Sequence, residues 1–394
     1  MGFGPANGIN GINGINGING INGINGINGI NGIDAVNGIG AAAVFPGPLI
    51  TTHDGIAGSW VLPTAFPVPH DTEPAAGWAD TLENWSPVVR AQVFDFELHS
   101  RLGFGTETPE GATSTAVMWH LDLAPGAQGA PPVPTYEPLV RMRRPSEDVL
   151  LDQLEFLPAY ADLRSDRAAE IVSQIAFPLA FFAAILPLDA ARTPRTLELL
   201  FAALRLAAVA EMRFKASLAV RRPSEYSAQV QPIIDVPGHG SLPSGHATEV
   251  FTAAVVLGEF MRIVGHPAYG TAPWREQLHM LASRVAVNRT VAGVHFPVDS
   301  CAGAVLGTTL GHYFAARCSP DNGRAFAARA FDGAAFPLQA DGPADFHWRD
   351  VYDHDAGAAN DLPWSSPAGT TALADTDRSA PLQWLWEQAA EEWA

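Results

Sequence analysis

The sequence predicts an all-α fold, a helical bundle with irregular extensions at its N- and C-terminal ends. Apolar residues recur every three to four positions through residues 151–317, which is typical of helices with one buried face. Residues 40–150, rich in Gly, Pro, Trp and Asp, and the acidic residues 318–394 lack this period. Hydrophobic residues make up 47% of the 394 residues, which suffices for a sizeable core and excludes general disorder.

The first segment, residues 1–39, is a low-complexity tail. Nine consecutive copies of Asn-Gly-Ile fill residues 7–33, and a further copy fills 37–39. A period of three matches neither helix nor strand, and Asn-Gly favours turns. We interpret the tract as a flexible tail, with an adhesive or interaction tract as the alternative. Residues 40–150 are expected to form irregular structure packed on the main domain.

The helical domain, residues 151–317, and its borders contain six segments with helical periodicity. One of them, 171–188, carries no charge, but polar and proline residues interrupt it, so we expect a core helix rather than a membrane span. The irregular region 318–394 closes with a short amphipathic helix at 382–393. The six segments are 149–164, 171–188, 196–220, 247–264, 278–289 and 298–317.

The charge and the cysteines exclude several classes of protein. The chain has 41 acidic and 23 basic residues, a net charge of −18, which disfavours a nucleic-acid or membrane-surface role. Its two cysteines, Cys301 and Cys318, fall near the two ends of one expected helix and cannot bond to each other. The N-terminus has no secretory signal pattern, so the cytoplasm is the default location.

Two cations and a helix start form the first part of a candidate site. Lys215 and Arg222 are seven residues apart, so they share one face at the end of a helix, which Pro223 is expected to end. Ser244 and Gly245 precede the apolar stretch that begins at residue 247, so they lie at a helix N-terminus. The free N–H groups and the dipole of such a terminus favour an anion, and a glycine lets the anion approach closely.

The second part of the candidate site follows at residues 289–299. Arg289 adds a third cation with planar donors. His295 precedes a helix expected to begin at Pro297, and Asp299 is near enough to bind His295 and fix its tautomer. Together the residues suit a tetrahedral or trigonal-bipyramidal oxyanion.

These motifs carry a resemblance to a known superfamily. Lys215-x6-Arg222-Pro223, then PSGH at 243–246, then NRTVAGVHFPVD at 288–299 resembles a signature in three parts. Type 2 phosphatidic acid phosphatases, soluble bacterial acid phosphatases and vanadium-dependent haloperoxidases share this signature. One departure is Asn288, where the phosphatase pattern usually has Ser. The resemblance implies the all-α bundle of the acid phosphatase and vanadium haloperoxidase type.

The resemblance also implies a role for each matched residue. His246 would be the acid–base residue, and His295 the nucleophile that becomes phosphohistidine or the ligand that binds the vanadium of vanadate. Asp299 would orient His295. The oxyanion, vanadate as a cofactor or phosphate as a substrate, would be held by Lys215, Arg222, Ser244, Gly245 and Arg289, together with His295.

Two reactions fit the same pocket, and we favour a vanadate-dependent haloperoxidase that oxidises halide with hydrogen peroxide. In relatives that oxidise bromide and iodide, a second histidine occupies the place of His239, seven residues before His246. The alternative is a phosphatase that hydrolyses phosphate monoesters, lipid phosphates included, and the short gap from His246 to His295 is normal for that class. An inactive adhesion protein and a membrane lipid phosphatase are further alternatives. A homodimer is the default assembly, as in related soluble enzymes.

Overall fold

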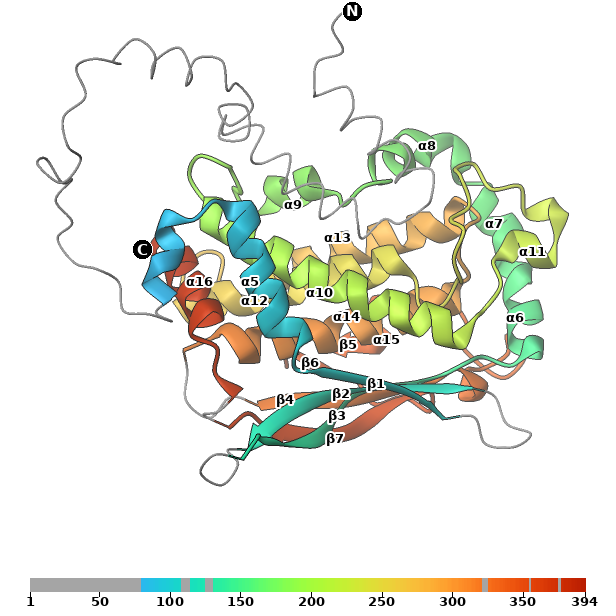
Figure 1. Cartoon of the computed structure of the whole chain (residues 1–394). Helices are drawn as coiled ribbons and strands as arrows, with labels where there is room; N and C mark the ends of the chain where they lie inside the picture. The colour runs from blue at the N-terminus through green and yellow to red at the C-terminus, as the bar shows by residue number, and fades with distance from the viewer. Residues whose placement is uncertain (1–78, 108–113, 125–129, 321–324, 354–355, 375–376) are drawn as a thin grey trace, which may run out of the picture.

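The computed structural model describes residues 79–107, 114–124, 130–320, 325–353, 356–374 and 377–394 (Figure 1). The predicted repeat tail 1–39 and the first part of the predicted region 40–150 lie outside the described residues. Long helices form one layer and a sheet lies against them, at the bottom of Figure 1. In chain order the helices are α5 (Pro87–His99), α6 (Glu147–Gln153), α7 (Leu157–Ala161), α8 (Arg164–Ser173), α9 (Leu179–Ile185), α10 (Pro194–Leu218), α11 (Pro223–Tyr226), α12 (Gly245–Val264), α13 (Ala272–Val291), α14 (Pro297–Cys318), α15 (Trp348–Val351) and α16 (Ala380–Glu391), with short 3-10 turns at Ala79–Asn84, Leu154–Phe156, Ala228–Val230 and Gly333–Ala335.

Local sequence explains where the long helices begin and end. The Ser244 hydroxyl accepts a hydrogen bond from the Ala247 N–H, 3.4 Å away, and caps α12, which ends at Gly265 with φ 75°. Pro297 is the first residue of α14, as predicted. The prediction that Pro223 ends a helix is wrong. Helix α10 ends at Leu218, because Ala219 takes the left-handed conformation, and Pro223 instead begins α11.

The contact between α12 and α14 is unusually close, because glycines of α14 face α12. A Cβ added at Gly303 would lie 2.7 Å from the Cβ of Ala247, and one at Gly311 would lie 2.7 Å from the Cβ of Val255. Helix α14 also carries Cys301 and Cys318, which are buried and free, so the prediction that they do not bond is confirmed. The close contact brings the N-termini of α12 and α14 together, and the candidate site forms there.

The all-α prediction is wrong, because a five-stranded sheet covers one side of the helices (Figure 1). The strand order is β1-β2-β3-β4-β7, antiparallel except for the parallel pair β3 and β4. A separate two-stranded ribbon pairs β5 with β6. The strands are β1 (Leu102–Glu107), β2 (Thr115–Ala124), β3 (Val133–Arg143), β4 (Ala325–Asp332), β5 (Tyr352–Asp353), β6 (Ala358–Ala359) and β7 (Ser365–Ala372).

The extensions predicted to be irregular therefore supply the sheet. Region 40–150 contributes β1 to β3, and region 318–394 contributes β4 and β7. The local sequence pattern does not predict these strands, for two reasons. β4 and β7 are rich in Ala, Gly and Ser, which have low strand propensity. In addition, β4 pairs with a strand 189 residues earlier in the chain, as at Arg143 and Asp332, and local reasoning cannot detect such a partner.

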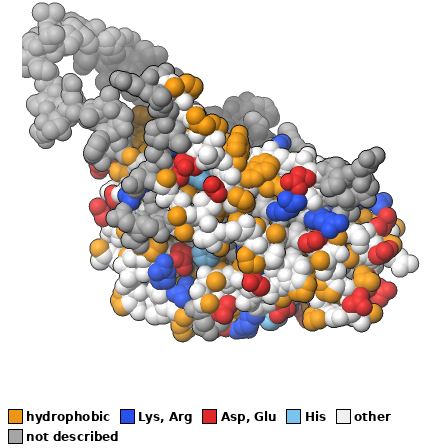
Figure 2. Space-filling view, turned by 90° about the horizontal axis from the view of Figure 1, so that it is seen from below, with side chains coloured by type: hydrophobic (Ala, Val, Ile, Leu, Met, Phe, Trp, Pro, Cys, Tyr) orange, Lys and Arg blue, Asp and Glu red, His pale blue; other side chains and the backbone are white. Residues whose placement is uncertain are grey.

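The sheet and the last helix pack against the bundle through buried side chains. His120 Nδ1 of β2 lies 2.9 Å from the hydroxyl of Tyr313 on α14. The ring of Trp386 on α16 meets that of Phe260 on α12 edge to face, with centroids 5.1 Å apart. Seen from the sheet side, acidic and basic side chains are interspersed with apolar ones (Figure 2). In the described part of the chain, no helix combines the length and apolar character that crossing a bilayer needs.

We expect Gly307→Ala to destabilise the protein. The new Cβ would press on the main-chain oxygen of Thr248, which cannot move without shifting α12. Overpacking of this kind costs about 1–3 kcal/mol in the free energy of unfolding, measurable by denaturant titration. Gly342→Ala is the matched control, since a Cβ there meets nothing within 4 Å. Equal stability of the two variants would contradict the proposed role of the glycine contact.

Candidate active site

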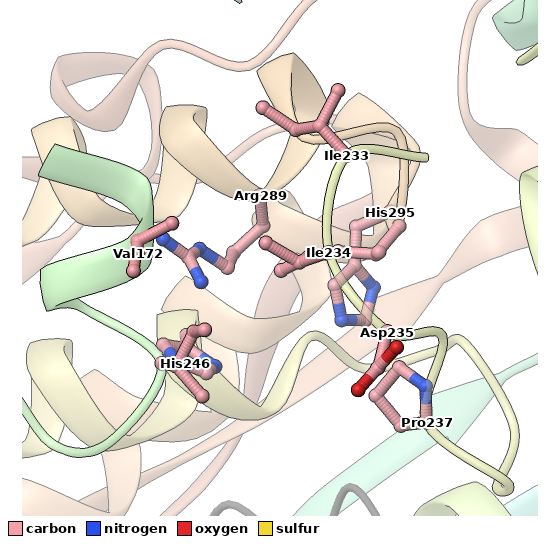
Figure 3. A pocket seen from close by; sticks show the side chains of 10 residues that line it. Val172, Ile233, Ile234, Asp235, Pro237, His246, Arg289 and His295 are labelled. Atoms are coloured by element: carbon pink, nitrogen blue, oxygen red, sulfur yellow. The ribbon is translucent and has the colours of Figure 1, made fainter. Parts of the chain in front are cut away.

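The candidate site surrounds a cavity of about 280 Å³ at the meeting point of several helix ends (Figure 3). Three predicted residues line it and come from separate elements: His246 lies in the first turn of α12, Arg289 lies in the last turn of α13, and His295 precedes α14. The rest of the lining is mostly apolar, from α8, the turn after it and the 233–237 loop. These further residues are Val172, Ile175, Ile233, Ile234, Asp235, Pro237 and Val294.

His295 is held by Asp299, as predicted from their spacing. The Nδ1 atom of His295 lies 3.0 Å from Oδ2 of Asp299, and Nε2 lies 2.9 Å from Nη1 of Arg222. Because a guanidinium can only donate, Nε2 must accept, so the ring proton is on Nδ1. Burial, then the charges of Arg222 and Lys215, hold the pKa of His295 well below its usual value. The imidazole is therefore neutral, with its lone pair on Nε2.

Asp299 is fixed by its own neighbours. Its Oδ2 accepts hydrogen bonds from the Ser241 hydroxyl and from the Phe296 N–H, which lies 2.9 Å away. Burial raises the pKa of Asp299 to about 6, against the opposing effect of these bonds. Sequence reasoning missed Ser241, because a serine in a glycine-rich loop gives no signal of its own.

Arg222 lies at one side of the site, next to His295. Besides His295, its Nη1 donates to the carbonyl oxygen of Val294 at 2.8 Å, and its Nε donates to that of His239 at 3.1 Å. The His239 ring also lies against this guanidinium, with Nδ1 3.1 Å from Nη2. His239 and Arg222 line a neighbouring cavity of about 460 Å³ rather than the one between His246, Arg289 and His295.

Lys215 braces the loop that leads into α12 and does not line the main cavity. Its Nζ donates to the carbonyl oxygens of Gly240, Ser241 and Pro243. These three bonds use all three of its protons. Burial, then the charge of Arg222, lowers the pKa of Lys215 to about 7. A bound oxyanion would have to draw this ammonium away from at least one carbonyl.

The start of α12 leaves no room for a side chain at Gly245. A Cβ there would lie 2.7 Å from Oε1 of Glu211, whose carboxylate has no hydrogen-bond partner in the part of the chain that the structure describes. Burial raises the pKa of Glu211 to about 7. Ser244 connects the start of α12 to the pair formed by His295 and Asp299, because its N–H donates to the carbonyl oxygen of Asp299 at 2.9 Å.

His246 and Arg289 face the cavity from opposite helices (Figure 3). His246 Nε2 lies 2.7 Å from the carbonyl oxygen of Gln174 and therefore carries a proton. Burial, then the charge of Arg289, lowers the pKa of His246 to about 3, so the ring is neutral. Among the described residues, Nε and Nη1 of Arg289 have no hydrogen-bond partner although both are buried. Unsatisfied buried donors fit a tetrahedral oxyanion such as phosphate or vanadate.

Comparison with known proteins agrees with the motifs. Residues 195–324 match the PAP2 superfamily, so the resemblance to type 2 phosphatidic acid phosphatases is confirmed for this segment. Over 92 residues the chain is 33% identical to decaprenylphosphoryl-5-phosphoribose phosphatase of Mycobacterium tuberculosis, in strains CDC 1551 and H37Rv alike. The match covers 23% of this chain and 45% of the relative, so the chain spans about half the length of the curated relatives it matches. The relatives are phosphatases by name, and the comparisons do not support a haloperoxidase.

We expect Lys215→Ala to weaken orthovanadate binding by about 1–3 kcal/mol, since one cation and the brace of the 240–243 loop are lost together. Isothermal titration calorimetry with orthovanadate measures the change. Arg213→Ala is the control: it removes an exposed cation two residues away on the same helix, where Arg213 lies over the Phe104 ring. Equal affinity in both variants would show that Lys215 does not support the oxyanion site.

Proposed function

We propose that this chain, which matches the PAP2 superfamily over residues 195–324, is a phosphohydrolase that cleaves phosphate monoesters through a phosphohistidine at His295. One observation carries the proposal: the lone pair of His295 Nε2 and the unsatisfied donors of Arg289 belong to the same cavity. A nucleophile and an oxyanion cradle are therefore placed together. The phosphatase relatives support this reaction.

In the first step the phosphoryl group enters between Arg289 and His295 and displaces the guanidinium of Arg222 from Nε2. His295 Nε2 attacks phosphorus as the ester P–O bond breaks. Asp299 keeps the proton on Nδ1 and stabilises the positive charge that the ring acquires.

The second histidine, His246, acts as the general acid and then as the general base. His246 is neutral in the free site because burial lowers its pKa, but an adjacent phosphoryl dianion favours the imidazolium and raises that pKa. Protonated His246 then gives its proton to the leaving oxygen. In the second step water attacks phosphorus, His246 takes a proton from that water, and the N–P bond to His295 breaks to release phosphate.

The comparisons do not support the haloperoxidase that the sequence analysis favours; they support the phosphatase, which was its alternative. In this structure the His239 ring contacts Arg222 and lines the neighbouring cavity, which gives no support to a role at the oxyanion. Vanadate has the shape and charge of phosphate and readily takes five-coordinate geometry. We therefore propose vanadate as an inhibitor that the same residues, His295 included, would bind.

His295→Ala should lower the turnover of p-nitrophenyl phosphate to less than about a hundredth, because it removes the Nε2 nucleophile that Asp299 orients. The rate of nitrophenol release measures it. Wild-type protein quenched during turnover should carry acid-labile phosphate, and the variant should carry none. His347→Ala, at an exposed histidine, is the control. Vanadate-dependent bromide oxidation without ester hydrolysis would refute the phosphatase.

The pH dependence of kcat/KM should show the ionisation of Asp299. As pH falls through about 6, its carboxylate gains a proton and can no longer accept from His295 Nδ1, so Nε2 loses its lone pair to the other tautomer. We expect kcat/KM to fall about tenfold per pH unit below that point. Asp299→Asn should be slow at every pH and lack this decline. The substrate ionises equally in both assays, so an unchanged decline in the variant would exclude Asp299 as its source.

A further inference from the structure

The C-terminal end of α8 lies at the candidate site although no motif predicts it. Helix α8 ends at Ser173 with Gln174 as its C-cap, inside the run 171–188 that sequence analysis treats as one core helix. The last carbonyl groups of any helix lack partners within the helix. Here two of them accept hydrogen bonds from catalytic candidates. Arg289 Nη2 donates to the Ile171 carbonyl at 3.3 Å, and His246 Nε2 donates to the Gln174 carbonyl at 2.7 Å.

The side chain of Gln174 binds Arg289 as well. Its Oε1 lies 3.2 Å from Nη2 of Arg289 and 2.9 Å from Nδ2 of Asn288, and its Nε2 donates to Oε1 of Glu170 at 3.0 Å. Gln174 is completely buried. These neighbours fix the amide orientation, because a flipped amide would point N–H groups at two donors and an oxygen at a carboxylate. Gln174 thus contacts the cation and the acid–base histidine at once.

We propose that Gln174 is a positioning residue of the oxyanion site. By holding Nη2 of Arg289, it leaves Nε and Nη1 of that guanidinium as the donors that face an incoming anion. By accepting from Nε2 of His246, it fixes the plane and tautomer of that ring. The partial negative charge at the end of α8 also favours the imidazolium once an anion is bound.

A glutamine suits this position better than other residues of its size. Glutamate would place a second carboxylate next to Glu170, whose hydrogen bond to Arg284 keeps its pKa low. Methionine would fill the same volume without an acceptor for Arg289. Gln174→Met therefore removes the side-chain hydrogen bonds and retains the backbone carbonyl that binds His246.

The inference rests on the proposed oxyanion site, so its test measures anion binding as well as turnover. Orthovanadate is titrated calorimetrically into the full chain, and kcat and KM are measured with p-nitrophenyl phosphate. For Gln174→Met we expect the Kd for orthovanadate and the KM to rise about tenfold while kcat stays within about threefold. Gln174→Asn, which keeps the amide but is too short to reach Arg289, should show the same pattern.

Arg284→Ala is the matched control, since it breaks the outer ion pair with Glu170 and leaves the bond from Gln174 to Arg289 in place. Its Kd should stay within about twofold of wild type. Wild-type affinity in folded Gln174→Met and Gln174→Asn would overturn the positioning role alone. Absence of orthovanadate binding in the wild-type protein would overturn the oxyanion site and the proposed function with it.

Discussion

The close contact between α12 and α14 is the constraint on which the site depends. Because glycines of α14 replace side chains at this contact, the two helices approach until the Ser244 N–H reaches the carbonyl oxygen of Asp299. That single bond joins α12, whose second residue is His246, to α14, which follows His295. A wider spacing would separate the two histidines and open the site to water. The geometry of the candidate site is therefore a consequence of backbone packing more than of the side chains to which we assign the chemistry.

The cationic side chains of the site donate their hydrogen bonds to uncharged acceptors. Lys215 is held by backbone carbonyls, and Arg222 by carbonyls and imidazole nitrogens. Arg289 is held by an amide oxygen and the end of a helix. None of these partners is a carboxylate that would compete strongly with a dianion, and an anion exchanges them for stronger charge-assisted bonds. Burial keeps both histidines neutral in the free site.

The long helices and the motif residues could be predicted because their signals are local. Periodic apolar residues, Pro297 and the Ser244 cap mark α12 and α14 directly in the sequence. The sheet could not be predicted, since β4 contains no β-branched residue and β3 meets β4 only through the tertiary fold. Gln174 and Ser241 were missed because their roles arise from contacts with distant segments. For His239, the sequence offered a resemblance alone, and the structure places Arg222 between it and His295.

The pairing of β3 with β4 has a consequence for how the chain reaches its native state. One sheet contains strands that precede the helical region and strands that follow it. The segment that matches the PAP2 superfamily therefore lies between two paired strand residues, Arg143 and Asp332, which are 189 residues apart in the sequence. Such contacts give a high contact order and slow folding, because most of the intervening chain must be ordered before the pairing forms. During synthesis the bundle would leave the ribosome with the part of α14 that packs on β4 uncovered. A chaperone, or rapid completion of the last strands, would then protect that apolar surface from aggregation.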